Sequence, residues 1–488
     1  MPVVRAPLAT PATPVTPPPP PRLPSANLNP NYQYGSHHGI SLLHGWLPLT
    51  VELVAVAALI LAIGWRTRRW RLVLLPICVV LGAAGAVAAW AYVNDQGLAS
   101  DPAPIELWAC AGVAVAAIAV AALGWRSARW WRRGVSVLAV PLALLSTGIV
   151  LDQWVGYYPT VQSAWNALTA GPLPNQTDID ALPALRNTTV TTGKIVPVRI
   201  PDTGSGFPHR TEYVYLPPAW FAGPTPPTLP VVMMIGGEFN TPADWIRSGQ
   251  IMPEVDKFTA ANGGRAPILV FVDSSGSFNN DTECVNGPRG DAADHLTADV
   301  PGYLESRFGA SADPANWAVV GWSMGGTCAV DLAVMHPELV RTFVDIAGDL
   351  GPTSGTKEQT IKRLFGGDAD RWAAFDPLTV MAKHGPYPDM AGLFDDLTPP
   401  KSGPGSHGAR QSAAVDDDTV GMGGHDGVID TGEIGAAEKL CAAGHEVGID
   451  CTIHTTQGGH TWQFAAAAFT SSFPWIVARV GLPVPDAT

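Results

Sequence analysis

The sequence predicts an α-helical transmembrane region followed by an α/β domain whose central sheet is mostly parallel. Two observations predict this fold class. The first third of the 488 residues contains four long apolar segments, and the remainder alternates strand-like and helical segments in the βαβ order of a parallel sheet. We divide the chain into a Pro-rich disordered tail (1–41), four transmembrane helices (42–158), a linker (159–188) and the α/β domain (189–488).

The four apolar segments are each near the roughly 20 residues that a helix needs to cross a bilayer. None shows the polar stripe at helical spacing that a helix of a soluble bundle would carry. Tryptophans such as Trp65 and Trp125 lie where interfacial aromatic residues are expected. The predicted spans are Leu47–Trp65, Leu72–Val93, Leu107–Trp125 and Val135–Val155.

The arginines predict how these helices are oriented. The loops after the first and third spans carry four arginines each, whereas residues 94–106, between the second and third spans, carry no basic residue. Because basic loops stay in the cytoplasm, we expect a multi-pass protein of the cell membrane with the α/β domain on the extracytoplasmic side. The loop arginines are Arg66, Arg68, Arg69 and Arg71, then Arg126, Arg129, Arg132 and Arg133.

Composition excludes some partners. The net charge of −13 argues against a nucleic-acid-binding surface. No dinucleotide fingerprint or Walker loop is present in the sequence, so we expect no cofactor. Six cysteines are too few for a disulfide scaffold, but Cys441 and Cys451 lie between a helix end and the next strand, where a bridge would fit in an oxidising compartment.

A Gly-x-Ser-x-Gly motif, Gly321–Gly325, follows the apolar strand-like run Ala318–Val320 and precedes an Ala- and Val-rich helical segment. This order forms the nucleophile elbow of an α/β-hydrolase, because small residues two positions either side of the serine permit the sharp turn. We therefore predict an α/β-hydrolase domain with Ser323 as the nucleophile. The alternative is a chance match in a glycine-rich chain.

The oxyanion that forms on the substrate needs two backbone donors. We expect one to be the N–H of Met324, directly after the nucleophile, and the other to come from the loop after an earlier strand. The run Val231–Ile235 supplies such a strand, so Gly237 or Glu238 is the expected second donor. Alternatively, the glycines there form only a tight turn.

The predicted general base is His460, which follows the strand-like segment Asp450–Thr455 and precedes a helix. The alternative is a loop histidine that packs on Trp462. For the acid that orients the base we expect a strand at Ala409–Val415 with a carboxylate in the turn after it. Our first choice is Asp418, with Asp416 and Asp426 as alternatives, although some of these carboxylates must belong to a solvated turn.

Residues 425–433 match the second half of an EF-hand loop, with Asp426 and Glu433 at ligand positions. Met422 and Gly424 would occupy the first two ligand positions and offer no side-chain oxygen. We therefore expect a surface loop here and no metal site.

From about Ile195 to its C-terminus the chain resembles the putative esterase family of α/β-hydrolases, which includes esterase D-like enzymes and mycobacterial mycolyltransferases. The resemblance implies a catalytic triad that contains Ser323 and His460. The mycolyltransferases take their acid as a glutamate on the helix before the last strand, which implies Glu438 as another candidate. The matching segments are Met234–Gly237, Asp244-Trp245, Val272–Phe278, Val319–Gly326, Phe375–Leu378 and His460–Trp462.

These observations predict a membrane-anchored serine esterase that acts on a lipid or other ester of the cell envelope through an acyl-enzyme on Ser323. Its expected partners are that ester and the lipid bilayer. Two alternatives stay open: an acyltransferase on the same site, and a non-catalytic hydrolase-fold binding module.

Overall fold

The computed structural model describes residues 39–96, 103–169, 171–398, 433–457 and 460–484. Three predictions fall outside these residues: the tail up to residue 38, the strand at Ala409–Val415, and the EF-hand-like loop up to residue 432. The candidate acids Asp416, Asp418 and Asp426 lie outside them as well.

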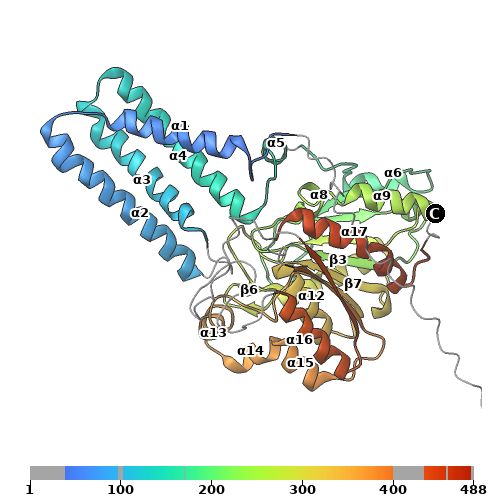
Figure 1. Cartoon of the computed structure of the whole chain (residues 1–488). Coiled ribbons are helices and arrows are strands. Elements are labelled where there is room, and N and C mark those ends of the chain that lie inside the picture. Colours follow the sequence, from blue (N-terminus) through green and yellow to red (C-terminus); the bar gives the residue numbers. More distant parts are fainter. Residues whose placement is uncertain (1–38, 97–102, 170, 399–432, 458–459, 485–488) are drawn as a thin grey trace, which may run out of the picture. The chain divides into compact units, whose positions relative to one another are not determined.

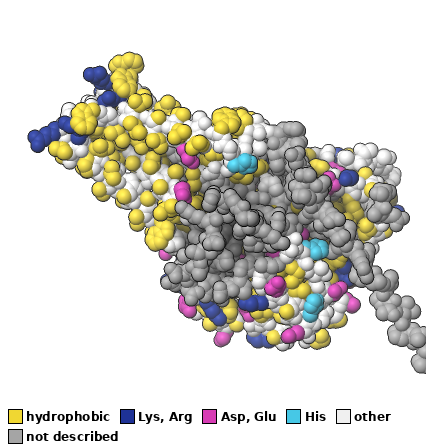
Figure 2. Space-filling model, viewed as in Figure 1, with side chains coloured by type: hydrophobic (Ala, Val, Ile, Leu, Met, Phe, Trp, Pro, Cys, Tyr) yellow, Lys and Arg dark blue, Asp and Glu magenta, His cyan; other side chains and the backbone are white. Residues whose placement is uncertain are grey.

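Four helices form the N-terminal region, and all four are long and apolar enough to cross a membrane. Their bounds agree with the predicted spans to within a few residues, except that a π-helical turn (Trp70–Leu74) begins the second and the fourth starts earlier. Hydrophobic side chains cover the outside of this region in Figure 2, as expected where lipid is the solvent. The helices are α1 (Trp46–Ile63), α2 (Leu75–Gln96), α3 (Ile105–Gly124) and α4 (Trp130–Val155).

Small residues allow the helices to approach one another. A Cβ on Gly82 of α2 would lie 2.7 Å from the carbonyl oxygen of Gly112 on α3, so glycine is required for this close contact. At one end of the bundle the two arginine loops meet: Arg66 donates to the carbonyl oxygen of Gly124 at 2.8 Å, and its guanidinium lies 4.2 Å from the ring centroid of Trp70. Both basic loops therefore lie at the same end, as two helical hairpins require.

The rest of the chain forms an α/β-hydrolase domain, which confirms the predicted fold class (Figure 1). Its eight-stranded sheet has the order β1-β2-β4-β3-β7-β8-β9-β10. The pairs β1–β2 and β2–β4 are antiparallel, and all pairs from β4 to β10 are parallel. The strands are β1 (Lys194–Val198), β2 (Glu212–Leu216), β3 (Val231–Ile235), β4 (Ile268–Val272), β7 (Trp317–Trp322), β8 (Thr342–Ile346), β9 (Ala391–Thr398) and β10 (Asp450–Gln457).

Helices cover both faces of this sheet (Figure 1). Helix α12 packs on β7 and β8, α16 packs on β9 and β10, and α17 packs on β7 and β8 from the other side. Every side chain of the central strands β3, β4, β7 and β8 is buried, which explains the continuous apolar runs of β3, β4 and β7. Strand β8 buries Thr342 and Asp345 as well. The longer helices of the domain are α9 (Met252–Ala261), α11 (Val300–Phe308), α12 (Met324–Met335), α13 (Lys357–Phe365), α15 (Pro377–His384), α16 (Glu433–Glu446) and α17 (Trp462–Arg479).

Two parts of the domain differ from expectation. The neighbour of β10 is β9, whose last residue lies eleven positions before the strand expected at Ala409–Val415. We did not expect β9 because Asp395 and Asp396 interrupt its apolar run. The expected linker contains a short helix, α5 (Val161–Thr169), and its later part joins the domain, where Thr177 N–H donates to the carbonyl oxygen of Ile195.

Candidate active site

The sharp turn between β7 and α12 carries Ser323 with φ 57° and ψ −125°, a left-handed conformation that L-residues rarely adopt. The flanking glycines make the turn possible. A Cβ on Gly321 would lie 1.6 Å from the carbonyl oxygen of Gly325, and a Cβ on Gly325 would lie 2.5 Å from that of Ile235. Because these neighbours are backbone atoms, no larger residue fits at either position.

The structure brings the predicted base to this serine. His460 Nε2 lies 2.9 Å from Ser323 Oγ, within hydrogen-bond distance. His460 precedes α17, and its ring lies against Trp322 with a centroid distance of 4.2 Å. Trp462, on which the alternative prediction placed the histidine, packs edge-on against Trp245 instead. The arrangement suits proton transfer from the serine to the imidazole.

The backbone N–H groups expected to stabilise the oxyanion belong to the start of α12 and to the loop after β3. Met324 is the first residue of α12, where N–H groups have no partner within the helix. Gly237 lies directly beside the nucleophile, since a Cβ on it would be 3.0 Å from Ser323 Cβ. However, the Gly237 N–H already donates to Asn240 Oδ1 at 2.7 Å. Of the two expected loop donors, Gly237 could therefore act only after Asn240 releases its amide.

Residues 208–389 match the family model described as "Putative esterase". The matched residues lie within the α/β domain and include the strands from β2 to β8. An uncharacterized protein of Corynebacterium glutamicum is 28% identical over 447 residues, which cover 89% of this chain and 96% of that protein. An alignment of this length reaches beyond the esterase domain into the helical region.

Two solved structures are similar to the esterase domain. A ferulic acid esterase shares 16% identity with a TM-score of 0.43, and the match covers 59% of this chain and 99% of that one. An S-formylglutathione hydrolase from Agrobacterium tumefaciens shares 18% identity with a TM-score of 0.45, over 60% of this chain and 98% of the other.

The acid of the esterase site stays a prediction. Asp418, Asp416 and Asp426 lie outside the described residues, and Glu438 is exposed on α16. Sequence reasoning missed two carboxylates on β9, Asp395 and Asp396, which are both buried. They stand in the half of β9 that pairs with His454 and Thr455 of β10, toward the sheet edge from which His460 follows. The signal that could have revealed them is an apolar run that ends in two aspartates.

Buried carboxylates also lie in the loop that precedes the short helix α10 (Ala292–Asp294). Burial is the main cause that raises the pKa of Glu283, and the nearby charges of Asp281, Asp349 and Glu238 raise it further. A disulfide between Cys284 and Cys328 fastens this loop to α12, the helix behind the nucleophile. We did not predict this disulfide. The bridge between Cys441 and Cys451, which their positions in the sequence would allow, is present.

Among the residues that the structure describes, two clusters have the composition of a metal site, and in both of them the potential ligand atoms already contact other protein atoms. The sulfurs of Cys441 and Cys451 are in the disulfide beside His445. A second, buried cluster joins His209, Glu212 and His295. His209 Nε2 and Nδ1 lie 2.6 and 2.9 Å from the carbonyl oxygens of Ile200 and Arg210, so both ring nitrogens are already within hydrogen-bond distance of protein oxygens.

His295 is held in a similar way. Its Nε2 lies 3.1 Å from Glu212 Oε1 and its Nδ1 lies 3.4 Å from Asp299 Oδ2. Burial alone would lower the pKa of His295, but the hydrogen bonds and charges of these two carboxylates outweigh it and raise the pKa. These contacts link strand β2 to the segment 295–299.

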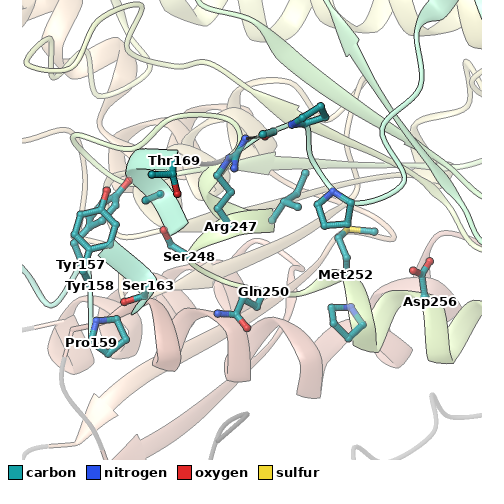
Figure 3. A pocket seen from close by; sticks show the side chains of 16 residues that line it. Tyr157, Tyr158, Pro159, Ser163, Thr169, Arg247, Ser248, Gln250, Met252 and Asp256 are labelled. Atoms are coloured by element: carbon teal, nitrogen blue, oxygen red, sulfur yellow. Dashed lines mark hydrogen bonds between the residues drawn. The ribbon is translucent and has the colours of Figure 1, made fainter. Parts of the chain in front are cut away.

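A cavity of about 650 Å³ lies between the segment that follows α4 and the helices α8 (Asp244–Arg247) and α9 (Figure 3). Ser323 and His460 are not among its described lining residues. Its labelled walls include Tyr157 and Tyr158 at one end and Met252 and Asp256 at the other.

Proposed function

We propose that this protein is a membrane-anchored serine esterase whose catalytic domain lies on the extracytoplasmic side of the cell membrane. The observation that carries the proposal is the 2.9 Å contact between Ser323 Oγ and His460 Nε2 at the elbow that begins α12. Acyl transfer needs a serine at the start of a helix whose hydroxyl is hydrogen-bonded to an imidazole.

In the proposed mechanism Ser323 Oγ attacks the ester carbonyl carbon while His460 Nε2 accepts the serine proton. The carbonyl oxygen becomes an oxyanion, which the N–H of Met324 and the positive end of the α12 dipole stabilise. When the tetrahedral intermediate collapses, the ester C–O bond breaks and His460 returns the proton to the leaving alcohol. Water, activated by the same imidazole, then hydrolyses the acyl-enzyme.

The location supports an envelope substrate. Four apolar helices and the basic loops at one end of their bundle favour a membrane protein with its arginines in the cytoplasm. Two disulfides in the esterase domain favour an oxidising compartment, which the extracytoplasmic side provides. A domain tethered there meets lipids and other esters of the envelope, so we propose one of these as its substrate.

Labelling with a fluorophosphonate probe tests the enzyme assignment. The purified full-length protein should be labelled at Ser323, and a panel of aryl esters of increasing chain length should be hydrolysed. Ser323→Ala should abolish labelling and lower kcat by at least about 10³-fold, because the nucleophile is lost. The matched control is Ser306→Ala, at an exposed serine on α11, which should behave as the wild type.

A folded wild-type protein that neither reacts with the probe nor hydrolyses any ester would instead support a non-catalytic binding module. An acyltransferase would pass through the same acyl-enzyme. Product analysis with and without an added alcohol separates the two enzymes, since only a transferase would form a new ester in preference to the free acid.

A further inference from the structure

The short helix α5 has two faces of different character. Trp165 and Leu168 are three positions apart and therefore share one face, on which they are 65% and 83% exposed. Ser163 and Ala167 are four positions apart and share the opposite face, which lines the cavity of about 650 Å³. The helix thus presents large apolar side chains to its surroundings and forms a wall of the cavity with its other side.

The start of α5 is held close to the ends of two spans. The N–H of Val161 donates to the carbonyl oxygen of Ile40 at 2.9 Å. Ile40 lies six positions before Trp46, where α1 begins, and Val161 lies six positions after Val155, where α4 ends. Since six residues can span at most about 20 Å, α5 must lie near the membrane surface if these helices cross a bilayer. Exposed tryptophan and leucine side chains are favourable at that surface.

The cavity has the size and the lining of a site for an apolar ligand. Its volume is within the roughly 300–1,000 Å³ that is usual for ligand pockets, and prolines, tyrosines and Met252 supply much of its wall (Figure 3). Arg247 and Asp256 are the charged members of its described lining. Both already contact protein groups, because Arg247 Nη2 donates to the carbonyl oxygen of Gly171 at 2.9 Å and Asp256 Oδ1 accepts from the hydroxyl of Tyr215 at 3.2 Å. A flexible hydrocarbon chain suits this lining better than a charged ligand does.

We propose that this cavity binds one acyl chain of a membrane lipid, which enters it from the bilayer leaflet nearest α5. The physical basis is that the side chains of an unfilled apolar cavity lack contacts on one side, and a hydrocarbon chain restores those contacts. Met252 suits such a ligand because its unbranched side chain adapts to an irregular surface. The proposal rests on the membrane anchoring in the proposed function, and it requires no reaction at Ser323.

The wall of this cavity also contacts the part of the chain that carries the proposed base. Gly249 lies between two lining residues, Ser248 and Gln250, and a Cβ on it would lie 3.2 Å from Trp462 Cε3. Trp462 is the first residue of α17, two positions after His460. A lipid chain in the cavity would therefore pack on a segment whose other side supports the start of α17.

The test is photolabelling of the full-length protein in phosphatidylcholine nanodiscs that contain a phosphatidylcholine with a diazirine on one acyl chain. After irradiation, mass spectrometry of peptides should find the label on the peptide that contains Met252. Ala167→Phe places a ring in the cavity and should lower this labelling about tenfold. The matched control is Leu168→Phe, which adds its ring on the exposed face and should label as the wild type does. Peptides of the four spans serve as the internal reference, since lipid surrounds them in every variant.

Thr169→Phe is a second variant in case Ala167→Phe does not fold, because Thr169 lines the same cavity and is more exposed (Figure 3). Label confined to the spans of the wild type, or an equal loss of label in Leu168→Phe, would overturn this inference alone. Release of the wild type from membranes by alkaline carbonate would overturn the anchoring and this inference with it. Label on the Met252 peptide of a protein that neither reacts with the fluorophosphonate nor hydrolyses an ester would support this inference and overturn the proposed activity.

Discussion

The disulfide between Cys284 and Cys328 should stabilise the esterase domain more than the disulfide between Cys441 and Cys451 does. Its cysteines are 44 positions apart, whereas Cys441 and Cys451 are 10 apart. Because a bridge restricts the unfolded chain more as its loop lengthens, the chain-entropy model gives about 4 kcal/mol for the first and about 2.7 kcal/mol for the second. At about 2 °C per kcal/mol for a domain of this size, loss of each bridge should lower Tm by about 8 and 5 °C.

The measurement is thermal unfolding of the full-length protein in detergent. In a Cys441→Ala/Cys451→Ala variant, a reductant acts on the longer bridge alone, and in a Cys284→Ala/Cys328→Ala variant it acts on the shorter one. Each Tm shift is therefore measured within one variant, with and without reductant, so the cavities left by the missing sulfurs do not contribute to it. Equal reductant-induced Tm shifts in the two variants, or shifts in the reverse order, would refute the reasoning.

Two further predictions concern the elbow and the buried histidines. Gly325→Ala should abolish folding or esterase activity, because the new Cβ meets the backbone oxygens of Ile235 and Gly236. Gly302→Ala should fold and keep its activity, because the space around Gly302 is open. Expression and Tm measurements check both variants. The raised pKa of His295 predicts that its contribution to the free energy of unfolding is full below about pH 6.5 and declines as pH rises through the folded-state pKa. Denaturant titrations from pH 6 to 9 should show this decline, and His295→Gln should flatten it; an unchanged slope in the variant would contradict the assignment.

Local sequence patterns were sufficient for the anchor and for two residues of the site. A membrane span is visible in the sequence because the bilayer demands a minimum length of apolar residues, and the observed helices follow the predicted spans. The elbow is visible because its turn excludes any Cβ at Gly321 and Gly325. Ser323 and His460 could therefore be named from their neighbours in the chain, and the fold then brought them to 2.9 Å.

Local sequence patterns could not identify the carboxylate that would orient His460. A carboxylate that orients a histidine needs only to be close to it in space, and an aspartate in a turn has the same local sequence whether or not it is. The expected strand at 409–415 illustrates the problem, since the strand that pairs with β10 is β9, where Asp395 and Asp396 break the apolar run. The local sequence around these two aspartates does not show that they are buried, because their burial results from the packing of the whole sheet.

By itself, then, the sequence determined which segments are apolar and long enough to cross a membrane, where the backbone must turn sharply, and which serine and histidine the fold would bring together. Tertiary structure alone decided that Cys284 bonds to Cys328 and that His295 lies between Glu212 and Asp299. The physical reason is that length, hydrophobicity and the steric demand of a turn act over a few neighbouring residues. A disulfide, an ion pair or a hydrogen bond instead requires two distant segments to meet, and only the packing of the whole chain brings them together.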